Sequence, residues 1–366
     1  MNTPSKETLF LLAVQSGIPV ILKGAPGEAK TSYIAALAKA SNRHLEVVIA
    51  STREPADFGG FPCLDNGVLR YVPPAWAQRL VDAKKNGKGG ILFFDEISCA
   101  APMCQNALLR VILERVVGET ELPPDLWVVA AMNPPEQTAS GWDLAAPMSN
   151  RFYHLNWEVN TEAWIGGMLT DFKAPEVETL PENWRESIPQ SRSLIASYIH
   201  ARPSNLRRFP EEESKRSGPW ASPRSWDMAS RISAAFQAAG YDDRAALSAV
   251  IGEDQANEFC NYRKQLDLPN PETLLANPTK FVFPASSDVT FAILTAVTAA
   301  VLNKNTPERY AAAWKLLKVA VDAKRADLAA HSARVLAMNR PANSKTMPNE
   351  IREFLPMLQN AKIRLQ

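Results

Sequence analysis

The stretch Gly24-Ala25-Pro26-Gly27-Glu28-Ala29-Lys30-Thr31 follows the apolar run 18–22 and precedes residues 32–39, whose composition is typical of a helix. A strand, a glycine-rich turn ending in Lys-Thr and a helix, in that order, are the context that a phosphate-binding loop requires. In such a loop the backbone N–H groups of the turn and the amino terminus of the helix surround phosphate oxygens. The order therefore predicts a site for a nucleoside triphosphate.

Two side chains of this loop have specific expected roles. Lys30 would bring positive charge to the β- and γ-phosphates, and the Thr31 hydroxyl would be a ligand of Mg²⁺. The usual pattern has glycine where this chain has Ala29, but a methyl group removes no backbone N–H, so phosphate binding can survive. Taken alone, the stretch also fits an ordinary strand-to-helix turn with a surface lysine. The residues expected to contact the nucleotide are Gly24, Ala25, Pro26, Gly27, Glu28, Ala29, Lys30, Thr31 and Ser32.

A second apolar run, residues 89–94, ends in the acidic pair Asp95-Glu96. A continuous apolar run is typical of a central parallel strand that is covered on both faces. Open α/β sheets bind their ligands at the carboxyl ends of such strands. We expect Asp95 to hold Mg²⁺, directly or through water, and Glu96 to orient and polarise the attacking water. Without the upstream loop, a strand ending in solvated acids would explain the pair.

A third apolar run, residues 126–132, ends at Asn133. The polar side chain of Asn133 can hydrogen-bond a γ-phosphate or a water molecule at the same edge of the sheet. An Asn-Pro turn explains this residue equally well in isolation. The order and the spacing of the three runs favour the functional interpretation.

Together these stretches resemble the AAA+ ATPases, and within them the MoxR-like group. The resemblance covers about residues 5–275. Besides the phosphate loop, it includes a Walker B segment (residues 93–96), the helix that follows it (102–115) and a sensor 1 asparagine (133–134). It also includes an Asp-Arg-Phe-like box in which Asn150 replaces the aspartate (149–152), a helix-2 insert (53–67) and a sensor 2 region (218–226). Within the insert, Asn66-Gly67 is by itself a strong signal for a tight turn.

The resemblance implies an α/β fold: a P-loop NTPase αβα AAA+ core with a helix-2 insert hairpin, followed by an α-helical lid and a C-terminal helical tail. The expected segments are a core (residues 1–165), a linker (166–217), a lid (218–275) and a tail (276–366). The first lid helix is expected over residues 227–240.

The resemblance also implies an assembly. AAA+ proteins complete their active site across a subunit interface, here in a ring that is expected to be a hexamer. Arg151 is the expected arginine finger, with Arg115 as its rival. Arg224 is the expected sensor 2 residue, acting within one subunit or across the interface.

The function implied is hydrolysis of ATP with Mg²⁺ to remodel or activate a protein client in a chaperone-like manner, often with a partner that carries a von Willebrand factor A domain. The insert region, about residues 53–75, and the hairpin at about residues 116–125 are expected to face the pore or the client. Two alternatives remain open. The first is a regulatory module with little or no hydrolysis, motivated by Ala29 and Asn150, and the second is a nucleic-acid motor. Preference for ATP over GTP is not read from any residue.

Composition limits these alternatives. The 366 residues are 46% hydrophobic and 22% charged with a net charge of +1, which is typical of a globular protein and gives no basic footprint for nucleic acid. The four cysteines have no metal-ligand or redox spacing. No targeting segment is visible, and the apolar run 289–302 is too short to span a bilayer. We therefore expect a cytoplasmic protein with no membrane segment.

Overall fold

The computed structural model describes residues 2–134, 137, 143–266, 268–344 and 347–360. Contacts group the chain into two compact units. The first contains residues 1–182 and 207–256, and the second contains residues 183–206 and 257–366. The core, linker, lid and tail expected from the sequence stay a prediction, because a grouping by contacts does not identify a lid or a linker.

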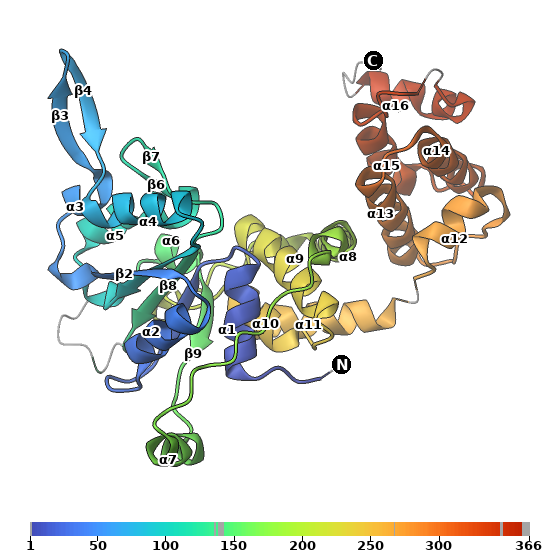
Figure 1. Ribbon diagram of the computed structural model, residues 1–366. Coiled ribbons are helices and arrows are strands. Elements are labelled where there is room, and N and C mark those ends of the chain that lie inside the picture. The colour runs from blue at the N-terminus through green and yellow to red at the C-terminus, as the bar shows by residue number, and fades with distance from the viewer. Residues whose placement is uncertain (1, 135–136, 138–142, 267, 345–346, 361–366) are drawn as a thin grey trace. The chain divides into compact units, whose positions relative to one another are not determined.

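The first unit is built on a five-stranded parallel sheet (Figure 1). Its order is β2-β5-β8-β1-β9. The strands are β1 (Val20–Lys23), β2 (His44–Ile49), β5 (Gly90–Asp95), β8 (Trp127–Met132) and β9 (Tyr153–Asn156). The three apolar runs of the sequence form β1, β5 and β8, and every residue of β8 is buried. The predicted α/β fold is confirmed, and β9 is an edge strand that the sequence did not indicate.

Helices cover both faces of this sheet, as a parallel sheet with buried strands requires. They include α1 (Lys6–Gln15), α2 (Lys30–Ala40), α4 (Ala75–Lys85) and α5 (Pro102–Glu114). Alternate strand residues such as Ile21, Leu92 and Phe94 pack with apolar side chains of α4 and α5 in one core cluster. α1 packs against β1, β8 and β9. The helices begin and end close to the sheet edges, so the loops between them gather at those edges.

Two antiparallel hairpins extend the first unit. The short helix α3 (Ala56–Gly59) leads into β3 (Phe61–Asp65) and β4 (Val68–Val72), and this hairpin projects from the sheet (Figure 1). Asn66 and Gly67 both have positive φ, 49° and 79°, the conformation of a two-residue type I′ turn. All ten residues of β3 and β4 are exposed. The predicted insert hairpin is therefore present. The smaller hairpin pairs β6 (Val116–Val117) with β7 (Thr120–Glu121).

The remaining helices of the first unit are α6 (Ala146–Ser149), α7 (Thr161–Thr170), α9 (Pro223–Ala238) and α10 (Arg244–Ile251). No residue of α7 is buried. α9 begins four residues before the predicted start at residue 227, because Ser222 and Ser225 form a reciprocal capping box ahead of it. Arg224 consequently lies in the first turn of a helix.

The second unit is helical. Its helices are α8 (Ile188–Ala201), α12 (Pro271–Ala276), α13 (Ser287–Asn303), α14 (Pro307–Asp322), α15 (Ala326–Met338) and α16 (Leu355–Asn360). α11 (Glu253–Gln265) begins in the first unit and ends in the second. The hydroxyls of Ser193 and Ser197 on α8 each lie 3.1 Å from Thr295 Oγ1 on α13. Trp314 of α14 is completely buried in the centre of this unit's core.

Short 3₁₀ helices connect these elements at Ala50–Thr52, Ile97–Cys99, Trp184–Ser187, Pro203–Leu206, Glu213–Lys215, Pro278–Lys280 and Asn349–Phe354. Among the described residues, every helix lacks the combination of length and apolarity that a bilayer crossing requires.

Candidate nucleotide site

The phosphate loop connects β1 to α2 through backbone that few side chains tolerate. A Cβ at Gly24 would lie 2.1 Å from the carbonyl oxygen of Trp157, so only glycine fits there. Gly27 has φ +87°, and Ala29 is left-handed with φ 52°. The Ala29 side chain is exposed, so its methyl group meets no steric barrier and only the backbone conformation is disfavoured, by about 1–2 kcal/mol. The departure from the usual glycine is thus compatible with the loop.

Lys30 lies inside the loop that it ends. Its Nζ donates to the carbonyls of Gly24 at 2.7 Å and Ala25 at 2.9 Å. It also donates to Asn133 Oδ1 at 3.1 Å. Burial lowers the pKa of the Lys30 ammonium, and the neighbouring carboxylates Asp95 and Glu28 oppose that shift. The structure thus brings the predicted phosphate lysine and the predicted sensor 1 asparagine into direct contact.

The predicted metal ligands also meet. Thr31 Oγ1 donates to Asp95 Oδ2 at 2.7 Å, and the backbone N–H of Glu96 donates to Asp95 Oδ1 at 3.0 Å. A hydroxyl and a carboxylate are the donor set that Mg²⁺ takes from a protein when phosphate oxygens and waters complete its octahedron. No group of three or more His, Cys, Asp or Glu side chains suited to a metal lies in the described ranges. Thr31 and Asp95 therefore fit a magnesium ion that arrives with its nucleotide.

Glu96 is held in place by a residue that sequence reasoning missed. Its backbone is left-handed, with φ 53°, and its Oε2 accepts a hydrogen bond from Ser51 Oγ at 2.7 Å. Ser51 follows β2, the neighbour of β5, so the contact depends on the sheet order. Left-handed backbone at a non-glycine residue stores strain and is concentrated at functional sites.

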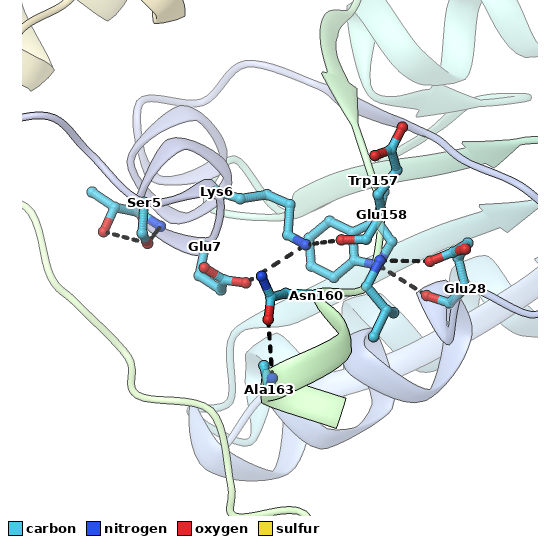
Figure 2. A network of polar contacts seen from close by, with 10 residues as sticks. Ser5, Lys6, Glu7, Glu28, Trp157, Glu158, Asn160 and Ala163 are labelled. Atoms are coloured by element: carbon cyan, nitrogen blue, oxygen red, sulfur yellow. Dashed lines mark hydrogen bonds and ion pairs between the residues drawn. The ribbon is translucent and has the colours of Figure 1, made fainter. Parts of the chain in front are cut away.

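The outer side of the loop is held by the segment that follows β9 (Figure 2). Trp157 Nε1 donates to the carbonyl of Glu28 at 3.0 Å, and the N–H of Val159 donates to the Glu28 carboxylate at 2.5 Å. Lys6 lies over the Trp157 ring and donates to the carbonyl of Glu158. Glu28 is therefore a structural support of the loop.

A cavity of about 530 Å³ opens beside the loop. It is lined by residues of the loop, by the carboxyl ends of β1, β8 and β9, and by Ser217. Asn133 lies on its wall together with Gly24 and Ala25. The predicted loop, Walker B and sensor 1 residues thus lie at one edge of the sheet, and loop residues and the sensor 1 asparagine border a space of the size that ligands occupy.

The predicted arginines lie elsewhere. Arg151 precedes β9 at the amino edge of the sheet, and its Nη1 donates to the carbonyl of Pro147. Burial, and then the positive charge of Arg224, lower the pKa of Arg151, while Glu114 opposes the shift. Arg224 is therefore close to Arg151. Arg115 donates to the carbonyls of Leu126 and Gly17, so it packs into the fold.

Asn150, which replaces the aspartate of the family's box, uses both ends of its amide. Its Nδ2 donates to the carbonyl of Trp220 at 2.9 Å, and its Oδ1 accepts from Ser222 Oγ at 2.6 Å. A carboxylate could accept from Ser222 but could not donate to Trp220. The asparagine thus holds the segment that leads into Arg224.

Comparison with known proteins supports this geometry. The family model of an AAA domain of the dynein-related subfamily matches residues 19–152. This segment is similar to AAA domains. The match includes the phosphate loop, the Walker B strand and sensor 1 asparagine, so nucleotide binding by this domain follows from the family as well as from the geometry.

Among solved structures, the chain is similar to a presumed ATPase from Cytophaga hutchinsonii ATCC 33406, with 19% identity and a TM-score of 0.43. The alignment covers 68% of this chain and 77% of that one. Similarity at this level adds nothing to the assignment. The search of curated proteins found no significant match.

The Gly24 contact generates the first prediction. In Gly24→Ala the new methyl group collides with a backbone carbonyl, so the loop must move; we expect a loss of about 1–3 kcal/mol in stability and severely weakened nucleotide binding. Ala29→Gly, the matched control in the same loop, should bind nucleotide at least as tightly as wild type. Thermal melting and titration with a fluorescent ATP analogue measure both. Equal binding by Gly24→Ala and wild type would contradict the loop geometry.

The two hydrogen bonds of the Asn150 amide generate the second prediction. Asn150→Asp places a carboxylate against the Trp220 carbonyl inside the protein, and we expect a loss of about 1–3 kcal/mol in the free energy of unfolding. Ser222→Ala removes the other hydrogen bond and also the side-chain cap of α9, so it should cost a similar amount. Urea unfolding measures both. A variant with aspartate as stable as wild type would show that the amide donor is unimportant.

Proposed function

We propose that this protein is a MoxR-like AAA+ ATPase that hydrolyses ATP with Mg²⁺ in a ring, expected to be a hexamer, and uses the cycle to remodel a protein client. The observation that carries the proposal is the Thr31–Asp95 contact with Glu96 directly beside it. Together they supply metal ligands and a base where the end of β5 meets the start of α2, next to the phosphate loop.

The residues divide the chemistry among them. When bound, Mg²⁺ would neutralise the negative charge that develops on the phosphates. Thr31 and Asp95 hold its position, and Lys30 exchanges its carbonyl contacts for the β- and γ-phosphates. Glu96, oriented by Ser51, positions the attacking water and accepts its proton. Asn133 aligns the terminal phosphate or that water.

The arginines support an active site shared between subunits. In the register of β9 with β1, Tyr153 is level with Val20. Gly24 lies four residues further along, about 13 Å at the usual rise per residue. Arg151, at the near end of β9, cannot bridge that separation to its own phosphate loop. Arg151 and its neighbour Arg224 therefore suit the nucleotide of an adjacent subunit, and the inward packing of Arg115 makes it the weaker candidate.

The exposed β3–β4 hairpin supports a role on clients. Leu64 is 80% exposed and Val68 58% exposed at its tip. A projecting hairpin with exposed apolar side chains suits transient contact with another polypeptide. We assign client contact to this hairpin and to the β6–β7 hairpin, and a protein with a von Willebrand factor A domain is the partner that the MoxR-like resemblance suggests.

The regulatory module is the second candidate, and its two motivations have structural explanations. Ala29 leaves the loop backbone intact, and Asn150 serves as a hydrogen-bonding bridge. A domain that only binds nucleotide also has no need for the strained, hydrogen-bonded Glu96. The net charge of +1 gives no support to a nucleic-acid motor.

If Glu96 is the general base, the variant Glu96→Gln should lose ATP hydrolysis. We expect steady-state ATP hydrolysis to fall by about 10²-fold or more while ATP binding remains, because a general base contributes that much. In wild type the rate per subunit should rise with protein concentration as subunits assemble. A negligible wild-type rate at all concentrations with ATP still bound would favour the regulatory module, or a motor that is silent without its partner.

The shared site predicts complementation. Arg151→Ala and Glu96→Gln should each be inactive alone, and a mixture should recover part of the activity. In mixed rings an intact Arg151 from one subunit meets an intact Glu96 in the next. The control is the double variant carrying both changes, which cannot supply either group. No recovery, with mixed assembly confirmed by a pull-down of differently tagged subunits, would contradict the action of Arg151 on a neighbour.

A further inference from the structure

Lys23 is a second lysine beside the phosphate loop. It is the last residue of β1 and directly precedes Gly24. Its Nζ donates to the carbonyl of Ser217 at 3.0 Å. Burial lowers the pKa of Lys23 to about 8, with the negative charge of Asp143 opposing the shift. The mechanism described above does not use this ammonium.

The register of the sheet places Lys23 on the nucleotide cavity. Lys23 is paired with Met132 on one side and with Asn156 on the other. All three residues line the cavity of about 530 Å³, which also includes Asn133 and the beginning of the loop. Lys23 and the sensor 1 asparagine thus face the same space.

The contact with Ser217 satisfies only part of the hydrogen-bonding capacity of the Lys23 ammonium. An ammonium has three N–H donors, and the described structure gives this one a single neutral carbonyl acceptor. The bond to Ser217 already has a charged donor, but a phosphate oxygen also carries the opposite charge and therefore attracts the ammonium more strongly than a neutral carbonyl does. A terminal phosphate in the cavity would therefore compete with the Ser217 carbonyl for Lys23.

Ser217, which accepts this hydrogen bond, lies in the segment that precedes Arg224. Ser217 begins a short segment, residues 217–222, that runs into the first turn of α9. Ser149 Oγ donates to the carbonyl of Gly218 at 2.7 Å, and Asn150 holds Trp220 and Ser222. The segment is thus attached to the carboxyl end of β1 through Lys23. Ser149 and Asn150 attach it to the Asp-Arg-Phe-like box at residues 149–152, here called the Arg151 box.

We infer that Lys23 is a phosphate-binding residue that distinguishes nucleoside triphosphate from diphosphate, and that its exchange of the Ser217 carbonyl for the terminal phosphate releases the segment that carries Arg224. The inference rests on the proposed function, because it assigns a ligand to the same cavity. Through Lys23, the nucleotide bound to one subunit would control the mobility of Arg224, which acts on the nucleotide of the adjacent subunit.

The test measures binding of fluorescent AMPPNP and fluorescent ADP, both with Mg²⁺, to full-length wild type, Lys23→Met, Lys23→Arg and Lys39→Met. Lys39 is exposed on α2 and gives the same change of charge. We expect Lys23→Met to lose about tenfold or more in affinity for AMPPNP, the loss of one charge-assisted hydrogen bond, with little change for ADP. Lys23→Arg should recover part of the discrimination, and Lys39→Met should match wild type.

Hydrogen exchange of residues 217–222 provides a second readout, independent of affinity. AMPPNP should raise exchange in this segment of wild type relative to ADP, whereas Lys23→Met should exchange rapidly with either nucleotide. Unchanged discrimination in Lys23→Met, or wild-type exchange that is equal with both nucleotides, would overturn the inference and leave the proposed function standing. Failure of wild type to bind either nucleotide would overturn both.

Discussion

The position of β8 between β1 and β5 determines the rest of the site. β8 pairs with both neighbours in parallel, with Met132 level with Lys23 and Ala130 level with Phe94. Asn133 therefore leaves its strand at the same level as Gly24, and its amide reaches Lys30. A shift of β8 by one residue would turn its side chains to the opposite face and separate the asparagine from the loop. β8 is buried on both faces, so the strand that completes the core also positions Asn133 at the site.

The same parallel arrangement separates the chemistry into two edges. The loop, the metal ligands and Glu96 follow the carboxyl ends of strands, whereas Arg151 precedes the amino end of β9. Since α5 begins after β5 and runs back past the sheet, Glu114 reaches the second edge and lies near enough to Arg151 to affect its pKa. In the proposed ring, cationic groups at the far edge of one sheet would serve the nucleotide of a facing subunit. The division between edges is thus consistent with the proposed assembly.

How much of this could be predicted from the sequence depended on the range of the interactions. The loop, the ends of β5 and β8, and the Asn66-Gly67 turn are local patterns, and the structure places each where the sequence indicated. Ser51 could not be identified, because its contact with Glu96 requires knowledge that β2 adjoins β5. The support of Glu28 by Trp157 and Val159 likewise arises from β9, a four-residue edge strand with no periodic signal. α8 was missed because the prolines around it suggested a connection, while its hydroxyls pair with Thr295 about a hundred residues away.

The segment 217–224 shows how a small contact can have a large effect on such a site. One hydrogen bond to a charged group contributes about 1.5–3 kcal/mol, which is the size of a typical coupling free energy between two sites. The bond between Lys23 and Ser217 is therefore sufficient, without any domain movement, to couple the loop to the arginine edge by about one to two orders of magnitude. Because Asn150 and Ser149 hold residues 218–222 to the Arg151 box, a change at Lys23 reaches the arginines and is not dissipated in a free loop.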